Sequence, residues 1–158
     1  MIFEPVTLEK DCWISGIEKK TSPDTLYEDL PVLSKEFAKI KPSIKNPIRP
    51  LTTCVATGKA KIFMGDFVER KDPNFASMSI KKGQLLVKVK VSFRFQAFLP
   101  AKVAGIRKKF YQNWLPESGY VSSQWQDLEV YHYRRRYFRK SRKMVMELWF
   151  LLANKKAD

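Results

Sequence analysis

The chain has 158 residues, the usual length of one domain; 44% of them are hydrophobic and 13% are aromatic. This composition excludes intrinsic disorder, and no apolar run reaches the roughly 18 residues of a membrane span, so we expect a soluble, cytoplasmic protein without a membrane partner. Thirty basic residues against sixteen acidic ones give a formal charge of +14, which makes an acidic or charged partner worth testing.

The first half of the sequence predicts a strand, a helix and two strands. The first strand is Cys12–Lys20, which alternates around a central glycine. Apolar residues then recur at helical spacing over 30–40, and Pro31, which fits only a first turn, predicts that the regular helix starts there. Pro42 predicts its end. The two strands that follow are expected at residues 52–60 and 61–70.

The second half predicts the same order of elements. Residues 85–95 show the clearest alternation, with valines and phenylalanines on one face and lysines on the other, which is typical of a sheet buried on one side. Pro100 can open a helix whose apolar stripe reaches Trp114, and we expect this helix to close before Pro116. The last two strands are expected at residues 128–133 and 144–152.

The two halves, roughly residues 10–75 and 76–158 of one domain spanning 1–158, therefore share the order strand, helix, strand, strand. Sequence identity between them is not convincing, so the repeat rests on element order alone. The order predicts an α+β fold in which tandem strand-helix-strand-strand modules form an antiparallel sheet with two main helices and a central ligand cleft.

Common catalytic and cofactor-binding motifs find no support in the sequence. Cys12 and Cys54 lack metal-ligand spacing, and we expect both to be reduced. His132 is the single histidine, which makes a hydrolytic triad hard to build, and we interpret it as a surface or half-buried side chain. No phosphate-binding loop, dinucleotide fingerprint or zinc peptidase motif occurs. We therefore expect no cofactor and no metal.

Carboxylates and aromatic rings in the second half are the informative residues. Glu129 and Tyr131 lie two apart on an expected strand and so point to the same face, and Glu147 and Trp149 repeat this pairing. A carboxylate in an apolar cavity takes up a proton or recruits a cation, and each well-placed ring adds roughly 0.5–2 kcal/mol of cation–π attraction. The alternative is that the rings are ordinary core and the acids face water; spacing leaves both open.

Three short motifs carry a resemblance to a known family. The segment 114–120 reads Trp-Leu-Pro-Glu-Ser-Gly-Tyr, and it is followed by Leu-Glu-Val-Tyr at 128–131 and Glu-Leu-Trp at 147–149. These motifs resemble the GyrI-like small-molecule-binding family, also described as the effector-binding domain of AraC-type and MerR-type regulators. Weaker agreement upstream extends the resemblance over nearly the whole chain.

The resemblance implies a ligand cleft between the two modules. In the family, the acid that matches Glu129 lies in this cleft and attracts cationic or polar aromatic ligands between aromatic walls. By motif position the walls would be Trp114, Tyr120, Tyr131 and Trp149. The predicted directions of their side chains place Tyr111, Phe67 and Phe37 in the cleft as well. The sequence departs from the family pattern at 149–152, where a proline is common, and in the short connection between residues 95 and 100.

A strongly basic segment is a third departure, since a more mixed loop is expected there. Its seven charges, half of the excess, are Arg134, Arg135, Arg136, Arg139, Lys140, Arg142 and Lys143. Such a segment could contact an anionic partner, either nucleic acid or a gyrase-like protein. The alternative is a solvated connection between two strands, which the lack of a helix-turn-helix, zinc-finger or RNA-recognition signature favours.

Together these observations predict a stand-alone domain that captures an amphipathic organic cation and serves in drug sensing, sequestration or transcription regulation. If the protein were instead an enzyme, it would be a hydrolase of electrophilic rings, with Glu129 as general base and Tyr131 as proton donor. The sequence leaves the ligand and the oligomeric state open.

Overall fold

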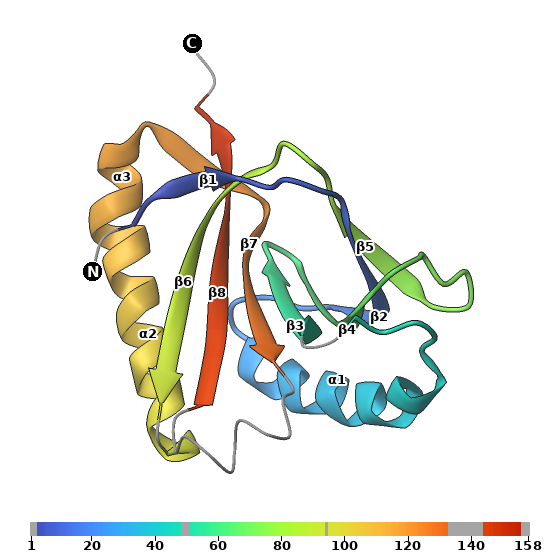
Figure 1. Cartoon of the computed structure of the whole chain (residues 1–158). Helices are drawn as coiled ribbons and strands as arrows, with labels where there is room; N and C mark the ends of the chain where they lie inside the picture. The colour runs from blue at the N-terminus through green and yellow to red at the C-terminus, as the bar shows by residue number, and fades with distance from the viewer. Residues whose placement is uncertain (1–2, 49–50, 94, 133–143, 156–158) are drawn as a thin grey trace.

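The computed structural model describes residues 3–48, 51–93, 95–132 and 144–155, and its elements alternate between strands and helices along the chain (Figure 1). The strands are β1 Pro5–Thr7, β2 Cys12–Lys20, β3 Leu51–Gly58, β4 Lys61–Val68, β5 Ala76–Ile80, β6 Leu85–Phe93, β7 Tyr120–His132 and β8 Met144–Asn154. The helices are α1 Leu26–Ile40, α2 Leu99–Lys109 and the short α3 Leu115–Ser118. Single turns lie at Lys41–Ser43, Gln96–Phe98 and Phe110–Trp114.

All eight strands form one antiparallel sheet, in the order β1-β6-β8-β7-β3-β4-β2-β5. β2, β3 and β4 of the first half are neighbours, as are β6, β7 and β8 of the second, and the halves meet where β7 pairs with β3. The edge strands are exchanged, because β1 pairs with β6 and β5 pairs with β2. The α+β fold class with two main helices is therefore confirmed. Within the described residues, no helix is both long and apolar enough to cross a bilayer.

Both main helices cover the same face of the sheet. Glu129 of β7 lies opposite Val55 on β3 and Leu148 on β8, so the three side chains share one face. Val55 packs in the cluster beneath α1, and Leu148 packs in the cluster beneath α2. The strip of sheet around β7 and β3 therefore lies between the two helix-covered regions, as Figure 1 shows.

The opposite face of the sheet holds the central core. Phe67 of β4 and Trp149 of β8 contact each other there, with ring centroids 5.6 Å apart. Two strands separate β4 from β8, which places them about 14 Å apart in a flat sheet. The ring contact therefore requires the sheet to curl around this core.

Cys12 and Cys54 are free thiols.

The sequence placed the start of the first helix incorrectly. The helix begins at Leu26, so Pro31 lies in its interior rather than in its first turn. Its first turn is held by Asp29, whose carboxylate accepts hydrogen bonds from the hydroxyls of Thr21 and Thr25 at 2.7 and 3.0 Å. Pro31 cannot donate to the carbonyl of Tyr27, but Tyr27 is highly exposed, so water can satisfy that group. The predicted end before Pro42 is confirmed.

Two corrections concern the region that leads to β7. The helical path does not close before Pro116, because a π-type turn at Phe110–Trp114 places this proline in the first turn of α3. The path ends at Gly119, whose left-handed φ of 80° suits a glycine. β7 then begins at Tyr120, eight residues before the expected strand. The short strands β1 and β5 were not predicted at all.

Candidate functional site

Two carboxylates occupy the strip of sheet between the helices. Asp127 and Glu129 lie two apart on β7, so the two-residue period of a strand points both toward the helix-covered face. The Asp127 side chain is 5% exposed, whereas that of Glu129 is 22% exposed. Asp127 is thus sealed in the protein, while Glu129 remains within reach of solvent or a ligand.

Helix α2 and the π-type turn that continues it bring two donors to Asp127. Arg107 and Tyr111 are four apart, so a helical turn places them on one face, next to the apolar stripe that packs on β8. The Arg107 guanidinium donates to Asp127 at 2.8 Å, and the Tyr111 hydroxyl donates to its other oxygen at 2.6 Å. Both oxygens of Asp127 are therefore satisfied.

Glu129 receives weaker contacts from the same group of residues. The Tyr131 hydroxyl donates to it at 3.3 Å, which confirms that the two side chains share a face. Its other oxygen lies 3.8 Å from the Arg107 guanidinium, beyond hydrogen-bond distance. Among the described residues, two carboxylates thus share one guanidinium. We call Arg107, Tyr111, Asp127, Glu129 and Tyr131 the acidic cluster.

The electrostatics of the acidic cluster follow from burial and the surplus carboxylate. Burial raises the pKa of Glu129 and the charge of Asp127 raises it further, although Arg107 and the Tyr131 hydroxyl oppose the rise. Burial also raises the pKa of Tyr111 and of Tyr131, so both hydroxyls stay protonated and can donate. For Arg107, burial disfavours the charged form, but Asp127 and then Glu129 outweigh it, and the pKa is raised.

A second acid lies on the same face beneath the end of α1. Asp66 of β4 is 5% exposed, and both of its oxygens accept from the Lys41 ammonium, at 2.7 and 2.9 Å. The Thr53 hydroxyl also donates to it at 3.0 Å. Among the described residues, Asp66 thus accepts from one ammonium and one hydroxyl, at shorter distances than those of Glu129.

Two of the predicted aromatic walls lie away from Glu129. The rings of Trp114 and Tyr120 stack on each other, with centroids 6.4 Å apart. Tyr120 lies opposite Asn154 and Glu129 lies opposite Leu148, so six residues of β8, about 20 Å, separate the two places. This ring pair and Glu129 do not form one wall in this structure.

The remaining aromatic predictions divide between the two faces of the sheet. Trp149 and Phe67 lie in the core on the opposite face, 2% and 1% exposed, so placing them beside Glu129 was wrong. Trp149 lies opposite Leu128, whose side chain points away from that of Glu129. Phe37 lies on α1 and is buried in the other helix-covered cluster. Tyr111 and Tyr131 are the predicted aromatic residues that the structure places in the acidic cluster.

The remaining predictions concern His132, the basic segment and metal binding. The His132 side chain is 22% exposed, in agreement with the half-buried position expected for it, and lies 2.7 Å from the Glu147 carboxylate. The basic segment 134–143 lies outside the described residues. Among those that are described, no group of histidine, cysteine, aspartate and glutamate side chains could hold a metal ion.

Sequence reasoning missed Asp127 and Arg107. Asp127 precedes Glu129 by two residues, so the same period of two could have placed it on that face. Arg107 lies four residues after Val103 and four before Tyr111, where a charge next to an apolar helical stripe indicates a buried partner. Neither signal identifies the other residue of the pair without knowledge of how the helix packs.

Comparison with known proteins finds similarity at the level of structure. No protein-family model matches the sequence, and no curated protein matches it. A protein described as a bacterial transcription regulation protein from Staphylococcus aureus MU50 superposes with a TM-score of 0.60 and 10% identity, covering 98% of this chain and 99% of its own. The C-terminal domain of EcmrR superposes with a TM-score of 0.55 and 14% identity, covering 98% and 100%.

A longer relative places the same fold within a larger chain. EcmrR in its complex with DNA superposes with a TM-score of 0.54 and 13% identity, over 98% of this chain but 57% of that one. At these identities the comparisons show a shared fold. They agree with the fold implied by the GyrI-like resemblance, and membership of that family stays a prediction.

Proposed function

We propose that this chain is a ligand-binding domain that takes an amphipathic organic cation beside Glu129, on the strip of sheet between α1 and α2. The observation that carries the proposal is the unequal charge of the acidic cluster, in which Asp127 and Glu129 share Arg107. A positively charged guest would supply the missing cation. Among the described residues, this leaves a local surplus of negative charge in a chain whose net charge is +14.

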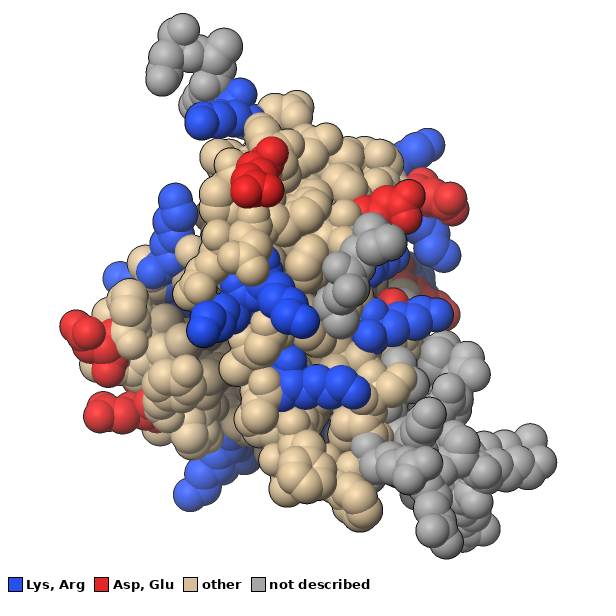
Figure 2. Space-filling view, turned by 90° about the vertical axis from the view of Figure 1, so that its left-hand side faces the viewer, with Lys and Arg blue, Asp and Glu red and all other residues tan. Residues whose placement is uncertain are grey.

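The exposure of the cluster supports this assignment. Glu129 is buried enough for its pKa to rise, yet 22% of its side chain remains exposed. Figure 2 shows the side of the molecule on which α2 and α3 lie, with lysine and arginine side chains spread over its surface. The acids of the cluster are mostly buried, so a cation would be drawn to a recessed site rather than to the surface.

The structural neighbours support a link to transcription regulation. One is described as a transcription regulation protein, and the EcmrR fold occurs in a chain bound to DNA. In such a setting this domain would sense or sequester its ligand. We propose that residues 1–158 act as one domain, with halves 10–75 and 76–158 meeting at the cluster.

A titration with ethidium, a planar aromatic cation, tests the proposal. Binding is measured by isothermal titration calorimetry with the wild type, with Glu129→Gln and with Glu117→Gln, which removes the same charge from an exposed position on α3. We expect Glu129→Gln to weaken binding about tenfold or more, and Glu117→Gln to leave it nearly unchanged. Equal affinity of all three proteins, or equal binding of the uncharged phenanthridine ring, would contradict the proposal.

The hydrogen bond between Tyr131 and Glu129 favours a second candidate, hydrolysis of an electrophilic ring. Glu129 would activate water as a general base, and the Tyr131 hydroxyl, which its raised pKa keeps protonated, would donate a proton. Turnover of an epoxide that disappears in both Glu129→Gln and Tyr131→Phe would favour this reading. Binding of ring compounds without any product would count against it.

A further inference from the structure

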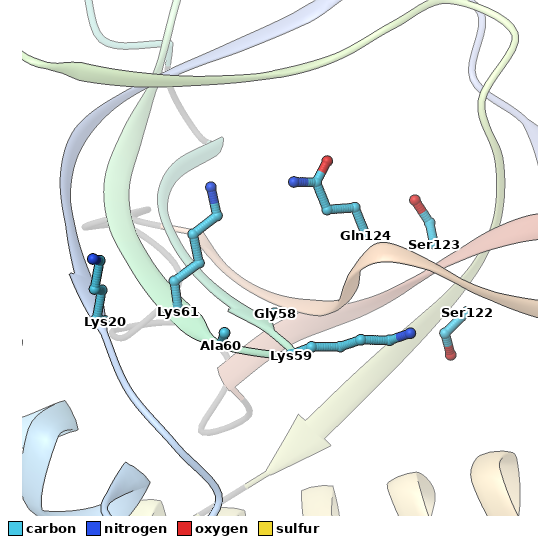
Figure 3. Close-up of a pocket in the computed structure, with 8 residues that line it drawn as sticks. All are labelled: Lys20, Gly58, Lys59, Ala60, Lys61, Ser122, Ser123 and Gln124. Atoms are coloured by element: carbon cyan, nitrogen blue, oxygen red, sulfur yellow. The ribbon is translucent and has the colours of Figure 1, made fainter.

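A second site lies at the tip of the β3–β4 hairpin, beyond the residues of the acidic cluster. An open pocket of about 480 Å³ is formed there by the hairpin, the end of β2 and the start of β7. This volume is in the range of small-molecule sites. Its lining residues, drawn in Figure 3, are Lys20, Gly58, Lys59, Ala60, Lys61, Ser122, Ser123 and Gln124.

The lining of the pocket is rich in hydrogen-bond donors. Three lysines, two serine hydroxyls and one glutamine amide contribute to it, and none of the eight residues is acidic. In Figure 3 the Lys59 side chain extends toward Ser122, whereas Lys61 and Gln124 project into the same open space. This arrangement presents positive charge and donors from several directions to one volume.

The strand register forces two of these charges together. Lys20 on β2 lies directly opposite Lys61 on β4. Like charges in a directly opposed pair destabilise a sheet, so an anion bound between them would relieve a cost that the fold carries. Glu18 offsets part of the charge, with its carboxylate 3.6 Å from the Lys61 ammonium. Among the described residues, Lys20 and Lys59 form no ion pair.

Irregular pairing in β7 and an aromatic ring beside the pocket position some of its lining side chains. Ser122 lies opposite Leu152, but the next residue in register, Asp127, lies opposite Phe150, so residues 123–126 have no partner on β8. This bulge turns the serines and the glutamine toward the hairpin. The Lys61 ammonium lies 5.0 Å from the centroid of the Trp125 ring, which holds this lysine at the pocket.

We propose that this pocket binds a small molecule that carries a phosphate group. Lysine ammonium groups, serine hydroxyls and an amide are donors from which a phosphate accepts hydrogen bonds, and the three lysines can offset the roughly two negative charges of a phosphate group. The site is separate from the acidic cluster, with which it shares no residue. The domain would then hold two sites of opposite charge, one for a cation and one for an anion.

The test compares pyrophosphate binding to three proteins at low ionic strength of about 50 mM. Calorimetry gives the affinity, and the amide signal of Gly58 and the indole signal of Trp125 in NMR spectra report the place of binding. The pocket variant is Lys59→Gln with Lys61→Gln. The control is Lys35→Gln with Lys39→Gln, which removes the same charge from two exposed positions of α1.

We expect pyrophosphate to shift both signals in the wild type, and the pocket variant to weaken binding about tenfold or more while the control keeps it. Equal weakening in both variants would show attraction to net charge alone and would overturn the proposal, as would no binding by a wild type whose NMR spectrum shows it folded. Duplex DNA that binds through Lys59 and Lys61 while pyrophosphate does not would also overturn it, because the occupant would then be a nucleic acid.

Discussion

The two helix-covered regions of the sheet differ in how closely cations approach their buried acids. Beneath α1, both oxygens of Asp66 accept hydrogen bonds from the Lys41 ammonium, at 2.7 and 2.9 Å. Beneath α2, the Arg107 guanidinium lies 2.8 Å from the Asp127 carboxylate but 3.8 Å from the carboxylate of Glu129 on the same strand. Among the described residues, the two acids therefore differ in how closely a cation approaches them.

This difference indicates which buried acid contributes to stability and which is free to serve binding. A buried carboxylate that accepts close hydrogen bonds from a cation is compensated within the fold. A surplus carboxylate costs free energy in the folded state, since burial disfavours its charged form. Its presence is explained if a cation binds there, which is why we assign the binding role to the α2 side.

The largest effect should come from removing Asp127. The change Asp127→Ala leaves the largely buried Arg107 without its close partner and Tyr111 without its acceptor, and we expect a loss of about 3 kcal/mol in the free energy of unfolding. Asp66→Ala should cost less, because the Lys41 side chain is 37% exposed and its ammonium can turn to water. Urea unfolding measures both. A loss below about 1 kcal/mol in Asp127→Ala would contradict the view that Asp127 is the main partner of Arg107.

A substitution on the opposite face should separate packing from binding. Phe67→Leu removes part of a ring that packs on Trp149, and we expect a loss of about 1–2 kcal/mol in unfolding free energy. Because Phe67 faces the central core, the affinity for ethidium should not change. A weaker affinity in a folded variant would mean that the ligand enters the core and that our placement of the site is wrong.

A smaller change is expected in the stability of Glu129→Gln. The raised pKa of Glu129 means that its contribution to stability is fully present below the ordinary glutamate pKa and is lost as pH rises through the raised value. At neutral pH the variant should therefore be as stable as the wild type or more stable, by up to about 1 kcal/mol, and its advantage should shrink on acidification. Thermal unfolding at several pH values measures this. A variant that is clearly less stable at pH 7 would show that Glu129 is already well paired.

The smallest expected effect is a pH dependence of cation binding. Protonated Glu129 offers no charge to a cation, and its raised pKa moves this loss to a higher pH than for an ordinary glutamate. Ethidium affinity should fall as pH is lowered toward the ordinary glutamate range, and binding should release protons into the buffer. The control is Glu129→Gln, which should show neither effect. A pH-independent affinity in the wild type would contradict the role of Glu129.

Much of the fold could be predicted because local patterns determine it. Cys12–Lys20 forms the predicted strand with the same bounds, and the alternation after residue 85 gives β6. The start of β7 could not be predicted, because the polar run 122–124 follows its first two residues and the bulge interrupts the alternation. The start of α1 was predicted too late because Pro31 is tolerated inside the helix. The hydrogen bond that Pro31 cannot form lies at a solvent-exposed turn, where its loss costs little free energy.

The candidate site could be predicted only in part, for a related reason. A period of two places Glu129 and Tyr131 together, and it needs no knowledge of the rest of the molecule. The separation of Trp149 from Glu129 depends on the register between β7 and β8, and the contact of Arg107 depends on how α2 packs. Long-range arrangements of this kind leave no local pattern in the sequence.

The most direct test of the surplus carboxylate is an NMR titration of the Glu129 carboxyl carbon, with and without ethidium. We predict that Glu129 in the free protein titrates above the ordinary glutamate pKa, and that its pKa falls when the cation binds, because the guest supplies the missing positive charge. A pKa at or below the ordinary value that does not respond to ethidium would contradict the account.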